Sequence, residues 1–299
     1  MPTIKLILKT PPAFMDALQI TRIPTPGLER PVRIAHITDV HIGKVADDDP
    51  EAAMLRDRME GLYGQWGRDF ESYFGQLLRR AEEERTDAIF LTGDAVNFPT
   101  PAAVEFTRAL IERFPRPVYF ISGNHDWTFP YQPRCNNALR IAQLPLAAPL
   151  FHDGAAVGYD VRDLGGIQVL SVDNSTYQID AVQLAFVRQR LGRGSPSVLL
   201  MHIPITQPVL RERTIAFWGQ PILMDDEMDA EARRQWNVEE PAPETAEFIN
   251  LLRASPNLRG VFCGHVHFGH EETFSPAAMQ YVGAPGFEGG IRLFEFEPA

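Results

Sequence analysis

Short apolar runs that each end in a charged or polar side chain recur along this sequence. Five of them cover residues 32–38, 88–92, 118–122, 198–201 and 261–263. Several are apolar at consecutive positions, which is typical of strands that are covered on both faces. Segments with helical spacing of apolar residues lie between them, for example residues 70–81. This alternation of strand and helix predicts an α/β fold.

Four further apolar runs and two cap patterns complete the predicted outline of the fold. The additional strands are expected at residues 18–23, 167–172, 279–282 and 291–296. Thr100 followed by Pro101 is typical of a helix start. Asp180 with Gln183 forms a capping-box pattern, and a last helix is expected over residues 244–253.

Two stretches, residues 43–68 and 205–243, are long for simple connections. Each begins just after one of the polar clusters that follow the strands. We therefore predict a single domain over residues 1–299, with insertions at these two places that lie over a site. The second stretch contains Phe217, Trp218 and Trp236, whereas disordered segments lack aromatic residues. We expect it to be an ordered acidic lid, and a contact in a homodimer is the open alternative.

The polar residues that follow the five runs are types that bind metal ions. They are Asp39, His41, Asp94, Asn124, His202, His265 and His267. Because the carboxyl ends of strands in an α/β sheet open onto one crevice, we expect these side chains to converge. Imidazole, carboxylate and amide ligands suit Mn, Fe, Zn, Co or Ni, and the set is too rich in nitrogen for Ca. Seven ligands exceed one tetrahedral site and match two adjacent metal ions that share a carboxylate.

The spacing of the ligand pairs has a geometric interpretation. In an extended segment, residues i and i+2 point the same way. The pairs Asp39 and His41, and His265 and His267, would then each present two groups to one cavity. A glycine precedes Asp94, Asn124 and His265, which we expect where the backbone turns tightly beside a ligand.

Charge and cysteine content restrict the classes of partner. The formal net charge is -11, from 28 basic and 39 acidic residues, which disfavours nonspecific nucleic-acid binding. Cys135 and Cys263 form neither a disulfide framework nor a CxxC zinc pattern, so a reduced, cytoplasmic location is expected. No apolar run is long enough to span a membrane, and the N-terminal run of residues 6–8 is too short for a signal peptide.

The polar clusters resemble, in order and spacing, the five motifs of calcineurin-like metallophosphoesterases. In this sequence they are Asp39-x-His41, Gly93-Asp94, Gly123-Asn124-His125-Asp126, His202 and Gly264-His265-x-His267. The resemblance spans about residues 32–296. It implies a β-sandwich flanked by helices, that is, a four-layer α/β/β/α arrangement.

The resemblance also implies two divalent or trivalent transition-metal ions, Mn, Fe or Zn, and a role for each motif residue. One metal would be held by Asp39, His41, Asp94 and His267, and the other by Asp94, Asn124, His202 and His265. Asp94 would bridge the two metals, and a bridging hydroxide would attack phosphorus in line. His125 would stabilise the transition state or protonate the leaving oxygen, and Asp126 would orient His125.

The branch of the family is less constrained than the family itself. Asp126 stands where protein phosphatases of the superfamily carry Glu, and their arginine-rich phosphate grip cannot be located in this sequence. The stretch RIAHITDVHIGK resembles bacterial phosphodiesterases, so a phosphodiesterase acting on a small phosphoester is favoured over a phosphomonoesterase. A nuclease would need a basic channel. A catalytically silent interaction scaffold would have lost ligands, whereas every ligand position here carries a competent residue.

Four residues close to the motifs allow structural as well as functional interpretations. His36, inside the first strand, is expected to be packed and hydrogen-bonded. Asn97 either orients a ligand or caps a turn. Trp127 either packs its loop or lines the substrate pocket, and His270 is expected in a surface loop.

Overall fold

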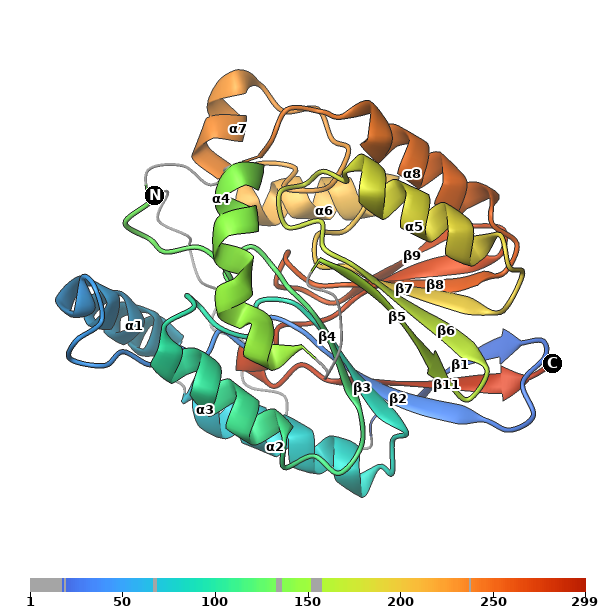
Figure 1. Cartoon of the computed structure of the whole chain (residues 1–299), viewed down its shortest axis with the longest axis horizontal. Coiled ribbons are helices and arrows are strands. Elements are labelled where there is room, and N and C mark those ends of the chain that lie inside the picture. The colour runs from blue at the N-terminus through green and yellow to red at the C-terminus, as the bar shows by residue number, and fades with distance from the viewer. Residues whose placement is uncertain (1–17, 19, 67–68, 133–135, 152–157, 237) are drawn as a thin grey trace.

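A computed structural model of the chain describes residues 18, 20–66, 69–132, 136–151, 158–236 and 238–299. The N-terminal apolar run and Cys135 lie outside these residues. Within them the strands form two sheets (Figure 1). The first sheet has the order β1 (Ile20–Thr25), β11 (Arg292–Pro298), β2 (Val32–Ile37), β3 (Ala88–Thr92) and β4 (Val118–Ile121). The second has the order β5 (Tyr159–Leu164), β6 (Ile167–Val172), β7 (Ser197–Leu200), β8 (Leu258–Cys263), β10 (Ala278–Val282) and β9 (His270–Ser275).

Parallel pairing dominates the centre of each sheet. In the first sheet β2, β3 and β4 run parallel, and β11 lies antiparallel to β2. In the second sheet β6, β7, β8 and β10 run parallel, and β5 and β9 are antiparallel edge strands. The carboxyl ends of the parallel strands therefore lie at one end of each sheet.

Helices cover the outer face of each sheet, which gives four layers. On the side of the first sheet lie α2 (Phe70–Glu83) and α3 (Pro101–Ile111), with α1 (Ala52–Trp66), α4 (Asn137–Gln143) and the 3-10 segments Leu144–Leu150 and Gly286–Glu288 near them. On the side of the second sheet lie α5 (Ala181–Leu191) and α8 (Pro243–Ala254), with α6 (Pro208–Trp218) and α7 (Ala230–Trp236). The predicted α/β/β/α arrangement is confirmed.

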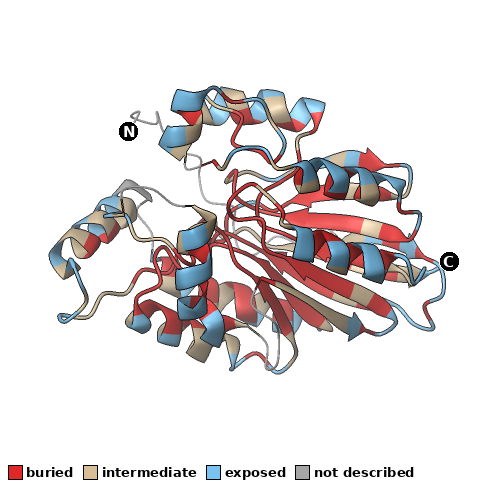
Figure 2. Ribbon diagram, turned by 45° about the horizontal axis from the view of Figure 1, so that its top comes forward, coloured by how far each residue is buried: buried red, intermediate tan, exposed pale blue. Residues whose placement is uncertain are grey.

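Alternation along the strands explains why they are apolar at consecutive positions. In β3, Phe90 faces the core between the two sheets, whereas Ile89 and Leu91 face α2 and α3. In β7, Leu200 faces the first sheet, whereas Leu199 faces α5 and α8. Both faces of β3 and of β7 are buried, and Figure 2 shows in red how burial concentrates in the central strands. Each such large apolar side chain contributes about 1.5–3 kcal/mol by burial.

The predicted helix starts carry the expected caps. The Thr100 hydroxyl accepts a hydrogen bond from the backbone N–H of Ala103, ahead of Pro101 at the first turn of α3. Asp180 and Gln183 form the reciprocal capping box of α5. These caps satisfy backbone N–H groups that have no partner inside the helix.

Both long connections contain helices. In the first, α1 buries Leu55 and Met59 against Phe98, a helix that the sequence pattern did not predict. In the second, α6 and α7 pack on the second sheet's side, and the linking residues 222–224 are fully buried. The action of this segment as an ordered lid stays a prediction, as does the single-domain division. None of the described helices has the length and apolar character that crossing a bilayer requires.

Candidate metal centre

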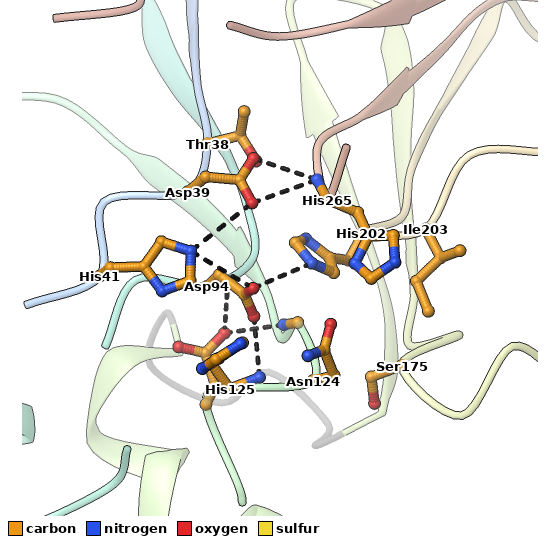
Figure 3. Close-up of polar contacts among 12 residues, drawn as sticks. Thr38, Asp39, His41, Asp94, Asn124, His125, Ser175, His202, Ile203 and His265 are labelled. Carbon is orange, nitrogen blue, oxygen red and sulfur yellow. Dashed lines mark hydrogen bonds and ion pairs between the residues drawn. The ribbon is translucent and has the colours of Figure 1, made fainter. Parts of the chain in front are cut away.

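Backbone hydrogen bonds tie together the loops that carry the predicted ligands. The N–H groups of Val40 and His41 both donate to the Asp94 carbonyl, at 2.9 Å, which joins the loops after β2 and β3. The N–H of His265 donates to the Asp39 carboxylate at 3.0 Å, which joins the loop after β8 of the second sheet to the first sheet. The N–H of Gly264 donates to the His202 carbonyl at 2.9 Å. The polar residues thus meet where the carboxyl ends of the two sheets face each other (Figure 3).

One group of ligand atoms is tightly clustered. Asp39, His41, Asp94 and His267 each place one ligand atom so that all four atoms lie within 4.8 Å of one another. The Nε2 atoms of His41 and His267 are 3.2 Å apart, and His267 Nε2 is 3.4 Å from Asp39 Oδ1. His41 Nε2 is 3.6 Å from Asp94 Oδ2.

A second group surrounds the other side of Asp94. His202 Nε2 lies 3.3 Å from Asp94 Oδ2, and the His265 ring lies 5.2 Å from the His202 ring between centroids. Figure 3 shows Asn124 on the same side of Asp94. The structure therefore brings all seven predicted ligands to one place, with Asp94 between the two groups.

The rings are held so that unprotonated nitrogens can face the centre. His202 Nδ1 donates to the Thr92 carbonyl at 2.8 Å, and His41 Nδ1 donates to the Asn97 side-chain oxygen at 3.2 Å. Such bonds fix the tautomer and direct Nε2 inward. His265 is held by the Tyr177 hydroxyl, 2.9 Å from its Nε2.

Two buried atoms test whether these residues fit metal ions. Within the described residues, Asn124 Oδ1 is buried and has no hydrogen-bond partner, and the buried His202 Nε2 faces the Asp94 carboxylate at 3.3 Å. Buried polar atoms normally have partners, because leaving them without one costs about 1–3 kcal/mol. Imidazole nitrogen, amide oxygen and carboxylate oxygen are donors that transition metals prefer. The residues present fit bound metal ions.

The electrostatics of the group are dominated by burial and by Asp94. Burial alone would raise the pKa of Asp94, but the neighbouring His202 and His125 hold it well below its usual range. Burial alone would lower the pKa of His202, but the Asp94 carboxylate raises it to about 10. Burial lowers the pKa of His41 and of His265 to about 3. His41 and His265 are therefore neutral near pH 7, as metal ligation requires.

The backbone conformation of the ligand pairs differs from the extended geometry expected from their spacing. Positive φ values between 50° and 72° occur at Asp39, His41, Asp94, His265 and His267. A residue other than glycine in this left-handed region costs about 1–3 kcal/mol unless its surroundings hold it there. The interpretation of each pair as an extended segment is therefore wrong. Left-handed turns, fixed by the hydrogen bonds between loops, direct both members of each pair inward.

The glycines before the ligands leave room that a side chain would fill. A Cβ atom on Gly93 would lie 2.4 Å from His202 Nδ1. A Cβ atom on Gly264 would lie 1.9 Å from Thr38 Oγ1 and 2.5 Å from Asp39 Oδ2. Ligands from different loops can approach closely only because these positions carry no side chain.

Asp126 does not orient His125 in this structure. Its carboxylate accepts hydrogen bonds from the backbone N–H groups of Asp94, Val96 and Gly123, at 2.7–2.9 Å. His125 Nδ1 instead donates to the Asn97 carbonyl at 3.0 Å. The predicted role of Asp126 is corrected: it holds the backbone around Asp94, because three N–H groups converge on it.

Asn97 orients two imidazoles, so of its two predicted roles, orienting a ligand or capping a turn, the structure supports the first. Its side chain binds His41 and its carbonyl binds His125. The sequence feature that indicated this role was its position three residues after Asp94.

The remaining nearby residues have structural contacts. His36 is buried and its Nε2 lies 2.8 Å from Thr92 Oγ1, as expected. Trp127 is buried and donates to Ser175 Oγ at 2.8 Å, so it packs its loop. His270 begins β9 rather than a loop, and its Nε2 lies 3.0 Å from Glu272.

Two residues near the centre were not singled out by motif. Trp218 of α6 donates from Nε1 to the Val266 carbonyl at 2.9 Å, and its ring lies 5.4 Å from the His267 ring. Tyr177, which holds His265, comes from the loop after β6 and has a φ of 68°. Neither lies next to a polar cluster in the sequence, so only the fold places them at the site.

Comparisons with known proteins agree with this geometry. A probable cyclic nucleotide phosphodiesterase of Synechococcus sp. is 27% identical over 280 residues, which cover 89% of this chain and 88% of that protein. A dimetal phosphatase of Danio rerio has a TM-score of 0.53 at 12% identity, over 86% of this chain and 88% of that one. A purple acid phosphatase of yellow lupin also has a TM-score of 0.53, at 16% identity, over 90% of this chain and 46% of that one. At these identities the two solved structures show a shared fold.

The family model for calcineurin-like phosphoesterases matches residues 32–269. These residues contain all five motifs on which the resemblance was based, and the resemblance is confirmed. The chain belongs to the calcineurin-like phosphoesterase family, whose members hydrolyse phosphoesters.

Proposed function

We propose that this protein is a two-metal phosphodiesterase that acts on small phosphodiesters. The observation that carries the proposal is the position of the Asp94 carboxylate, with His41 and His202 on its two sides at 3.6 Å and 3.3 Å. A carboxylate between two sets of nitrogen and oxygen donors suits a pair of metal ions that share it.

The proposed ligand sets follow the two groups of side chains. Asp39, His41, Asp94 and His267 would hold one metal ion. Asp94, Asn124, His202 and His265 would hold the other, where the unpartnered Asn124 Oδ1 and the buried His202 Nε2 lie. A bound metal pair would neutralise charge on the phosphoryl oxygens and lower the pKa of water, so that a nucleophile forms near neutral pH.

His125 is proposed to protonate the leaving oxygen. Its backbone N–H donates to Asp94 Oδ1 at 2.9 Å, which places the ring beside the centre. Its Nδ1 proton is held by the Asn97 carbonyl, so Nε2 is the atom that would take up a proton from water and pass it to the leaving oxygen. Its ring also lies 4.8 Å from the His41 ring between centroids.

Two observations favour diesters over monoesters. The Synechococcus relative is described as a probable cyclic nucleotide phosphodiesterase, although its identity to this chain is 27%. The sequence also lacks the recognisable arginine-rich grip with which protein phosphatases of the superfamily hold a dianion. Phosphomonoesterase activity is the second candidate. The net charge of -11 disfavours a nuclease, and the complete ligand set disfavours a silent scaffold.

A panel of esters tests the proposal. Protein loaded with Mn²⁺ is assayed on bis(p-nitrophenyl) phosphate, p-nitrophenyl phosphate and double-stranded DNA, and kcat/KM is compared. We expect the diester to be the best substrate and DNA to remain intact. A higher kcat/KM for the monoester would replace the proposal by the second candidate, and hydrolysis of neither ester would overturn both.

A further inference from the structure

Arg58 of α1 is half-buried, and no described residue serves as its counter-ion. Among the described residues its guanidinium makes neither a hydrogen bond nor an ion pair, although Asp57 and Glu60 are close in sequence. Arg56, two positions before Arg58 on the same helix, pairs with Asp47. Burial lowers the pKa of Arg58 below its ordinary value. A partly desolvated guanidinium without a partner is costly in an acidic chain, where carboxylates are plentiful.

The helix face beside Arg58 packs on loops that also carry residues of the metal centre. Leu55 and Leu62, one turn before and one turn after Arg58, pack in a cluster with Phe98 and Phe129. Phe98 directly follows Asn97, and Phe129 lies four residues after His125. The loops in that cluster are thus the same loops that carry the residues around the leaving oxygen.

A side-chain contact fixes α1 against these loops. Met59 Sδ accepts a hydrogen bond from the Asn97 side chain at 3.2 Å. Asn97 in turn binds His41 and His125. Asn97 therefore joins the helix that carries Arg58 to both imidazoles.

We propose that Arg58 binds the phosphoryl group of the substrate on the side of His125. This inference rests on the proposed function, and it adds a cationic contact that the metal ligands do not supply. A guanidinium offers paired N–H donors that match the oxygens of a phosphoryl anion. The ligand class is a phosphate or phosphate ester, and inorganic phosphate is its simplest member.

The direct test measures phosphate affinity in protein loaded with Mn²⁺. Isothermal titration with inorganic phosphate compares the wild type with Arg58→Gln and Arg58→Met, of which the second keeps an apolar stem for packing. Arg56→Gln is the matched control, since it removes a charge from the same helix. We expect both Arg58 variants to bind phosphate about tenfold or more weakly than Arg56→Gln. Metal content and melting temperature should match the control.

Kinetics on bis(p-nitrophenyl) phosphate give a second readout. A contact to the phosphoryl group raises KM in the Arg58 variants, and Arg58→Lys, which keeps the charge without the paired donors, falls between them and the wild type. If the Arg58 variants bind phosphate as tightly as Arg56→Gln while the wild type hydrolyses the ester, the inference about Arg58 fails and the proposed function stands. If the wild type hydrolyses neither ester of the panel, the proposed function fails, whatever the phosphate affinities.

Discussion

The Nε2 atom of His202 lies 3.3 Å from Asp94 Oδ2, across the boundary between the two sheets. His202 follows β7 of the second sheet, whereas Asp94 follows β3 of the first. The same Asp94 oxygen lies 3.6 Å from His41 Nε2, which belongs to the first sheet. The proposed metal site therefore joins the two halves of the sandwich, and its occupancy should affect both the chemistry and the cohesion of the fold.

Asp94 and Asp39 should differ in the number of metal ions whose binding depends on them. Asp94 is proposed to contact both ions and Asp39 only one. We expect Asp94→Asn to retain close to no metal after Mn²⁺ loading and gel filtration, and Asp39→Asn to retain about one ion per chain. Elemental analysis of the two variants and the wild type checks this. Equal metal content in the two variants would contradict the bridging role of Asp94.

Metal affinity should rise with pH because His202 holds a proton when no metal is bound. In the metal-free protein the pKa of His202 is raised to about 10 by Asp94, so His202 is protonated at neutral pH and must lose that proton to bind a metal. From pH 7 to 9 the affinity should increase about tenfold per pH unit for this proton. Competition titrations with a chelator measure the slope, and His202→Gln should make it shallower. A slope that is the same in both proteins would contradict this.

The same raised pKa affects the stability of the metal-free protein. Because the folded pKa of His202 exceeds the ordinary value of 6.5, its stabilising contribution is complete below about pH 6.5 and is lost as the pH rises through about 10. Thermal unfolding of the chelator-treated protein should therefore move to lower temperature between pH 7 and 10. His202→Gln, which does not titrate, is the matched control for this interval.

His125 should matter most for poor leaving groups. A group that donates a proton to the leaving oxygen contributes about 10²–10⁴-fold, and this help is small when the leaving group is already a stable anion. His125→Ala should therefore slow hydrolysis of an alkyl phosphodiester far more than that of bis(p-nitrophenyl) phosphate. Its metal content should equal that of the wild type. Equal losses on both esters would show that His125 acts on the phosphoryl group instead.

Trp218 should hold the loop of His265 and His267 in its strained conformation. Trp218→Phe keeps the ring beside His267 but removes the hydrogen bond from Nε1 to the Val266 carbonyl. A loss of about 0.5–1.5 kcal/mol should weaken metal binding roughly 2- to 13-fold. Trp236→Phe is the control, since Trp236 Nε1 has no hydrogen-bond partner among the described residues. Identical metal affinities in the two variants would exclude this role of the Trp218 hydrogen bond.

The convergence of the ligands was predictable from the sequence because it depends on strand order alone. Each ligand directly follows an apolar run, and parallel strands bring such positions together. The conformation of the ligand turns was not predictable. Positive φ at Asp39 and His41 is unfavourable for the isolated residues, and it is sustained by hydrogen bonds from a loop more than fifty residues away.

The contacts behind the ligands were the least predictable part of the site. Asp126 and Asn97 both lie close to a motif, and only the fold shows that Asn97 faces His125 while Asp126 faces backbone N–H groups. Arg58 lies in a stretch whose helix has weak amphipathic character, so its pattern of apolar residues did not indicate a buried face. Trp218 lies in α6, and its hydrogen-bond partner Val266 lies in the loop after β8, so the sequence did not indicate this contact.

The position of β11 determines when this site can form. Residues of β11 lie between β1 and β2, so the last strand of the fold separates the first two. Until it is in place, β2 has an open edge and β1 lacks its neighbour in the sheet, although Asp39 and His41 at the end of β2 are already made. A growing chain must therefore keep that edge from pairing with other strands until synthesis has passed β11. Removing β11 should therefore weaken the support of Asp39 and His41, which lie far from it in sequence.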